Sequence, residues 1–128
     1  MGGGFVELGV VTEPSYVYRA VCNSCYDGDT ITVDVDLGLG VWVHGQKLRL
    51  FGIDAPEVRG DERCRGLDSR DALRDLIEGR EVLVKTRRDK KGKYGRWLAT
   101  VFFRSEEHGM MDVNRWLVSL GYAEKREY

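Results

Sequence analysis

Short stretches in which apolar and polar residues alternate place the strongest restriction on the fold of this chain. Residues 31–35 alternate with a period of two, which is typical of a strand with one buried face. A β-prone run over residues 16–21 precedes this strand, and an Asp-Gly turn at 27–28 joins the two. Residues 41–53 predict one long or bulged strand, interrupted at Gly45. The N-terminal half is therefore predicted to be antiparallel β-structure.

The pattern then changes, and apolar residues recur at helical spacing. This spacing predicts a helix over residues 68–78, ended by a glycine. Two further strands are expected at 82–86 and 97–103, on either side of a basic loop, and Asp112 is suited to cap a second helix. The order strand, strand, strand, helix, strand, strand, helix predicts a β-rich α+β fold, a five-stranded Greek-key OB-fold barrel with two or so packed helices.

The length of 128 residues is usual for one domain. We expect residues 1–14 to be an N-terminal extension and residues 15–128 to form the folded domain. No stretch approaches the length of about 18 apolar residues that a membrane helix needs, so no membrane partner is expected. The glycine-rich start lacks the features of a signal peptide and leaves the localisation open. Because the net charge is −1, any recognition of phosphate has to be local.

Three cysteines, an odd number, argue against a framework of paired disulfides. Cys22-Asn-Ser-Cys25 has the spacing of a zinc or redox motif, but no second close pair follows it. We therefore expect Cys22, Cys25 and Cys64 to be buried or incidental thiols, with a zinc or redox site as the alternative.

Acidic residues at the ends of two predicted strands are the first candidates for chemistry. The period of two places Asp29 at the rim of an apolar face, where a carboxylate is costly unless a cation compensates it. Its alternative role is that of a turn residue capping its own loop. Arg49, Asp54 and Glu57 gather at the end of the long strand. Asp29, Asp54 and a backbone carbonyl beside Asp54 are hard ligands suited to Ca²⁺ or Mg²⁺, and Glu57 can polarise a water molecule. A structural ion pair of Arg49 with Asp54 or Glu57 is the alternative.

The loop between the last two strands supplies a third group of candidates. In Lys93-Tyr94-Gly95-Arg96 the arginine offers a bidentate contact to a phosphate, and the tyrosine offers a ring or hydroxyl to a sugar or base. A solvated basic hairpin is the alternative for this segment alone. Only the combination with the two acidic segments makes a phosphate site the stronger interpretation.

In this order and spacing, the three segments resemble the staphylococcal nuclease (thermonuclease) family. The resemblance extends from about Tyr16 to Ala123 and includes the closing Leu120-Gly-Tyr-Ala123. It implies that Asp29, Asp54 and the backbone carbonyl of Ala55 bind one Ca²⁺ ion. It also implies that Arg49 and Arg96 hold the scissile phosphate, that Glu57 is the general base, and that the substrate is contacted by Lys93, Tyr94 and Tyr122.

Some positions depart from the pattern of this family. Ala55 stands where many relatives have threonine, although either residue supplies a backbone carbonyl. The loop between Glu57 and the first helix is short. The tyrosines that relatives place beyond the second helix are not clearly matched, since Glu127 lies near one such position. We therefore expect weaker stacking on a base, with help from Tyr94 and Tyr122.

The resemblance implies a Ca²⁺-dependent nuclease that hydrolyses DNA and RNA with little sequence specificity and leaves 3′-phosphate ends. Its partners would be single-stranded or frayed nucleic acid, and we expect a monomer. The first alternative is a non-catalytic OB-fold module that binds nucleic acid or protein, although such a module has little use for acids facing phosphate. The second is a structural or redox domain organised by Cys22 and Cys25.

Overall fold

The computed structural model describes residues 13–90 and 96–127 of the chain. Within these ranges the strands and helices follow the predicted order, with three short strands and one 3₁₀ turn in addition. The elements are β1 (Val17–Asp27), β2 (Thr30–Gly38), β3 (Val41–Leu50), β4 (Ile53–Asp54), η1 (Gly60–Glu62), α2 (Arg63–Ile77), β5 (Glu81–Arg88), β6 (Trp97–Ser105), β7 (Gly109–Asp112), α3 (Val113–Ser119) and β8 (Glu124–Lys125).

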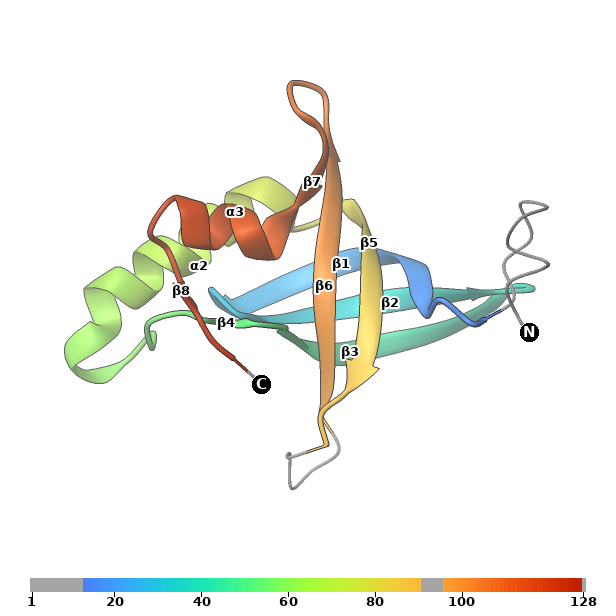
Figure 1. Cartoon of the computed structure of the whole chain (residues 1–128), viewed down its shortest axis with the longest axis horizontal. Helices are drawn as coiled ribbons and strands as arrows, with labels where there is room; N and C mark the ends of the chain where they lie inside the picture. The colour runs from blue at the N-terminus through green and yellow to red at the C-terminus, as the bar shows by residue number, and fades with distance from the viewer. Residues whose placement is uncertain (1–12, 91–95, 128) are drawn as a thin grey trace.

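Five of the strands close into a mixed barrel (Figure 1). β1, β2 and β3 form an antiparallel meander, β1 also pairs with β5, and β5 pairs with β6. Parallel pairing of β3 with β6, with Leu48 opposite Trp97, closes the barrel. α2 packs against β1, and α3 packs against β6. The predicted five-stranded OB-fold barrel with two helices is therefore confirmed.

The alternation in the sequence decides which side chains fill the barrel. Ile31, Val33 and Val35 of β2 are buried, and the residues between them are partly exposed. α2 adds Leu73 and Ile77, which are fully buried in the same core. Burial of such a side chain stabilises the fold by roughly 1.5–3 kcal/mol relative to leaving it exposed.

Two of the cysteines lie in this core because β1 is irregular. The register of β1 against β2 shifts between Cys22 and Ser24, so residues three positions apart both face inward. Cys22 and Cys25 are fully buried free thiols with their sulfur atoms 3.8 Å apart, whereas Cys64 is free and exposed. Cys22 and Cys25 thus fill space in the core.

α2 begins at Arg63, five residues before the start that the apolar spacing predicts. The predicted boundary was wrong because glycine is a poor helix former, and Gly66 nevertheless lies buried inside the helix. A Cβ atom at this position would lie 1.9 Å from the carbonyl oxygen of Glu57. The close approach of α2 to the segment after β4 therefore requires glycine, whatever its helix propensity.

A two-stranded sheet outside the barrel was not predicted. β4 pairs with β8 in antiparallel fashion, with Ile53 opposite Lys125 and Asp54 opposite Glu124. The amide of Arg126 extends the pairing by donating to the carbonyl of Gly52 at 2.8 Å. The C-terminal segment is thereby held beside Asp54. Neither helix in the described part of the chain is long and apolar enough to cross a membrane.

Candidate active site

The turn between β1 and β2 brings Asp29 against the segment after β4. A Cβ atom at Gly28 would lie 2.7 Å from the Cβ of Ala55 and 2.8 Å from the Cβ of Ser69 in α2. Only glycine allows this approach without a shift of the backbone. The amide of Ala55 then donates to Oδ2 of Asp29 at 2.8 Å. Residues far apart in the sequence meet here because Gly28 has no side chain.

Arg49 joins the two candidate metal ligands. Pairing of β2 with β3 places Arg49 opposite Thr30, beside Asp29. Its Nη1 lies 2.9 Å from Oδ2 of Asp29, and its Nη2 forms an ion pair with Oδ1 of Asp54. Nη2 also donates to the carbonyl of Ile53 at 3.2 Å. The guanidinium, with its side chain only 10% exposed, therefore bridges a buried and an exposed carboxylate.

Asp27 and Asp29 lie in hydrogen-bond contact across the turn. Burial, reinforced by hydrogen bonding to Asp29, raises the pKa of Asp27 to about 6. Burial alone would raise the pKa of Asp29 too, but hydrogen bonds from Asp27 and the Ala55 amide, with the charge of Arg49, lower it. Asp29 is therefore ionised at neutral pH and can serve as an anionic ligand.

Arg126 completes the ion-pair cluster from the C-terminal segment. Its Nη1 lies 3.2 Å from Oδ1 of Asp54, the atom that also accepts from Arg49. The two carboxylates and the two guanidinium groups sum to a formal charge of zero. A neutral cluster can accept a cation and a phosphate together at lower electrostatic cost than a cluster with a large net charge.

The donor atoms of the site are oxygens, the type of ligand that a calcium ion prefers. Asp29 and Asp54 offer carboxylate oxygens, and the backbone of Ala55 lies against Asp29. Across residues 13–90 and 96–127, no group of three His, Cys, Asp or Glu side chains is arranged to hold a metal. Two carboxylates and one carbonyl would leave about half of the roughly six to eight oxygen positions of Ca²⁺ to water and substrate. Such an open site is the kind that a catalytic ion needs.

Glu57 and Tyr122 lie around a hollow beside this cluster. The hollow has a volume of about 610 Å³ and is also lined by Asp54 and Ala55. Glu57 is exposed, and its backbone carbonyl packs against Gly66 of α2. Tyr122 is half-buried, and its backbone carbonyl accepts from the hydroxyl of Ser69 at 2.6 Å. The structure thus places the candidate base around the same cavity as two residues that are candidate metal ligands, Asp54 and Ala55.

Arg96 has a different partner in this structure. Its Nη2 lies 3.0 Å from Oδ2 of Asp89, a buried carboxylate, and its side chain is 51% exposed. This ion pair joins the end of β5 to the start of β6. Lys93 and Tyr94 lie outside the described residues. The role of Arg96 in phosphate binding therefore stays a prediction.

Three charged residues that shape the site were not among the candidates from sequence: Asp27, Asp89 and Arg126. Asp27 stands two positions from Asp29, so the Asp-Gly-Asp pattern was a usable signal. Asp89 and Arg126 carry no local signal. Their contacts depend on the fold of the hairpin and on the pairing of β8 with β4.

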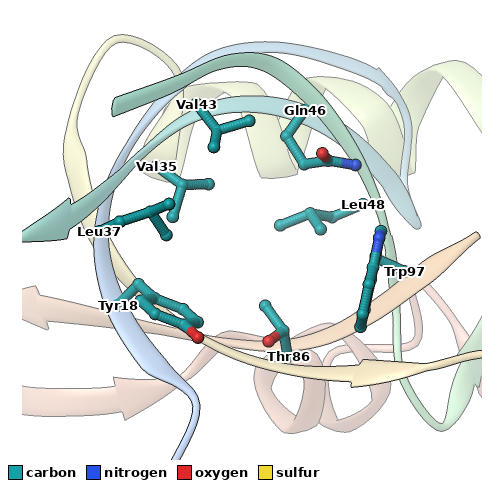
Figure 2. Close-up of a pocket in the computed structure, with 8 residues that line it drawn as sticks. All are labelled: Tyr18, Val35, Leu37, Val43, Gln46, Leu48, Thr86 and Trp97. Carbon is teal, nitrogen blue, oxygen red and sulfur yellow. The ribbon is translucent and has the colours of Figure 1, made fainter. Parts of the chain in front are cut away.

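A second hollow, of about 210 Å³, opens at the mouth of the barrel (Figure 2). Tyr18, Val35, Leu48 and Trp97 are among the side chains that point into it. Among its lining residues that the structure describes, none is charged. An apolar cavity of this kind offers no group for acid–base or metal chemistry, so the ion-pair cluster is the stronger candidate for an active site.

The comparison with protein families bears on the same region. The family model described as staphylococcal nuclease homologue matches residues 47–128 of the chain. A search of curated proteins with this chain found no match. The matched segment includes Arg49, Asp54, Glu57 and Arg96, while Asp29 lies before it.

Proposed function

Because the chain belongs to the staphylococcal nuclease homologue family, we propose that it is a calcium-dependent nuclease acting on DNA and RNA. Family membership supports a nuclease-type hydrolase in general terms. Dependence on calcium is proposed from one observation, the bridge that Arg49 makes between Asp29 and Asp54. The bridge brings together a guanidinium, which can bind phosphate, and two carboxylates, which are hard ligands for Ca²⁺.

Arg49 and Arg96 are proposed to hold the scissile phosphate. A guanidinium donates in a rigid fork that matches two phosphate oxygens, and its charge opposes the negative charge that develops in the transition state. Arg49 is pre-positioned by its carboxylate partners. When bound by Asp29, Asp54 and the Ala55 carbonyl, Ca²⁺ would add positive charge at a phosphate oxygen.

Glu57 is the proposed general base. Its exposed carboxylate shares a hollow with Asp54, so a water molecule there can give its proton to Glu57. The water oxygen then attacks phosphorus, and the bond to the 5′-oxygen breaks. The 5′-oxygen takes up a proton from solvent and leaves as a 5′-hydroxyl, and a 3′-phosphate remains. In this reaction the carboxylates hold the metal ion and accept a proton, while the two arginines hold the phosphate.

The proposed substrate is single-stranded or frayed nucleic acid, bound by a monomer with little sequence specificity. Lys93, Tyr94 and Tyr122 are the proposed contacts to the substrate. Contacts to phosphate, sugar and base faces discriminate weakly between sequences, since the hydrogen-bonding edges of the bases carry most of the sequence information.

The test is cleavage of single-stranded DNA and RNA with Ca²⁺ and with EDTA. We expect EDTA to abolish cleavage, and Glu57→Gln and Arg96→Ala each to slow it by about 10²–10³-fold, the range for loss of one preorganised catalytic group. Glu81→Gln and Arg104→Ala are the matched controls, because both residues are exposed and lie on strands away from the cluster. If the folded parent protein binds these strands without cleaving them, the non-catalytic binding module is the better description.

A further inference from the structure

A groove on the opposite side of β8 from the acidic hollow differs from it in charge. It has a volume of about 410 Å³ and lies between β4, β6, α3 and β8, elements that Figure 1 shows next to one another. Phe51, Arg115 and Lys125 are among its lining residues. The ion-pair cluster contributes none of its members to this lining.

The charges of the groove suit a polyanion. Arg115 and Lys125 are exposed, and within the described ranges neither side chain takes part in an ion pair. The guanidinium of Arg87 lies over the ring of Phe51, 4.0 Å from its centre, at the edge of the groove. Among the described lining residues the single acid is Asp112, whose carboxylate accepts from the Arg115 amide. The groove is therefore locally positive in a chain whose net charge is −1.

The hollow that contains Glu57 has the opposite character. Its described lining holds four acids and one base, namely Asp54, Glu57, Glu62, Glu124 and Arg65. Successive residues of β8 divide the two sides, because Glu124 faces the hollow and Lys125 faces the groove. Phosphates beyond the scissile one are therefore favoured on the basic side over the acidic side.

The groove lies one position along the β4–β8 ladder from the candidate active site. Asp54 is paired with Glu124, and the next pair along the same ladder, Ile53 with Lys125, borders the groove. One residue along a strand advances the chain by about 3.3 Å. A strand with its phosphate at Arg49 and Asp54 therefore reaches Lys125 within a nucleotide or two.

We propose that this groove binds the phosphates of nucleotides that flank the scissile bond in single-stranded nucleic acid. The proposal rests on the proposed function, since it takes the Arg49 cluster as the place of cleavage. Lys125 and Arg115 bind successive phosphates, and the strand leaves the site between β8 and α3. Longer strands are bound more tightly than single nucleotides for this reason.

The test measures binding of a fluorescein-labelled 12-nucleotide DNA strand by anisotropy in EDTA, where cleavage does not interfere. The variant is Arg115→Gln with Lys125→Gln, and the matched control is Arg104→Gln with Lys85→Gln. The control removes the same two charges from exposed positions that line neither groove. Both proteins are checked for a thermal unfolding midpoint equal to that of the parent.

Each phosphate contact on a single strand changes the binding constant as about the −0.7 power of salt concentration. At about 0.1 M salt one contact is thus worth about 5-fold relative to 1 M, and the loss of two is worth roughly 25-fold. We expect the groove variant to bind roughly 25-fold more weakly, with its salt slope reduced by about 1.4, and the control to change by less than about 3-fold.

Equal weakening in the two variants, unchanged binding in the groove variant, or no binding by the parent overturns the proposal. Cleavage assays on the same proteins separate it from the proposed function. A parent that cleaves in Ca²⁺ while the groove variant binds normally refutes the groove alone. A parent that binds through the groove but never cleaves refutes the nuclease and leaves a binding groove.

Discussion

Gly66→Ala changes one hydrogen to a methyl group at the point where α2 meets the segment that carries Glu57. The new Cβ atom would lie 1.9 Å from the carbonyl oxygen of Glu57 and 2.4 Å from its carbonyl carbon. Real Cβ contacts are essentially never closer than 3.0 Å, so the backbone at Glu57 has to retreat by about 1.1 Å. The substitution therefore displaces the proposed base without altering its side chain.

The effects on stability and on rate differ in size. Alanine improves helix propensity by about 1 kcal/mol, while overpacking costs about 1–3 kcal/mol, so the free energy of unfolding should fall by at most about 2 kcal/mol. Displacement of a catalytic group by about 1 Å can lower the rate on the order of 10²-fold. We expect the loss of activity to exceed greatly what the loss of stability explains.

The assay compares initial rates of DNA cleavage in Ca²⁺ with urea unfolding for the parent and for Gly66→Ala. Gly79→Ala is the matched control, because Gly79 has a φ of +77° and its added Cβ atom would meet nothing within 4 Å. This control is destabilised by about 1–2 kcal/mol through backbone strain alone, with Glu57 in place. Parent-like rates in Gly66→Ala, or equal losses in both variants, would refute the reasoning.

Three further predictions concern the cluster and the thiols. Arg49→Gln should lower the free energy of unfolding by about 3 kcal/mol, because it leaves the buried carboxylate of Asp29 without its cation. The control Arg19→Gln breaks an exposed ion pair with Glu81 and should lower this free energy by less than about 1 kcal/mol. Both values are measured by urea titration. Calcium at about 100 times its dissociation constant should stabilise the parent by about 2.7 kcal/mol, measured as a rise in Tm. Asp54→Asn should lose most of this rise, and Asp36→Asn, at a partly exposed position on β2, should keep it. A parent with an unchanged Tm would count against a calcium site. Alkylation followed by mass spectrometry should modify exposed Cys64 alone in the native protein, because the hydrogen bond that Cys25 donates to Cys22, together with burial, raises the pKa of Cys25. Three adducts before unfolding would contradict this.

Much of the barrel could be predicted from sequence because strand signals are local. Burial of alternate residues in β2 follows directly from the period of two. Asp112 also caps α3 as predicted, since its side chain accepts from the amide of Arg115 at 3.1 Å. The predicted start of α2 was wrong, because Gly66 argued against a helix there. Glycine occupies this position because the helix packs against the carbonyl of Glu57. Helix propensity alone cannot report a contact that forms only after the chain has folded.

The sequence by itself determined the order of the strands, the family resemblance and the candidate residues Asp29, Arg49 and Asp54. Only the tertiary structure decided their partners. It brought Arg126 to Asp54, paired Arg96 with Asp89, and set Glu124 and Lys125 on opposite sides of β8. Patterns of alternation act between neighbours in sequence, whereas ion pairs and grooves join residues that meet only when β4, β8 and α3 pack together.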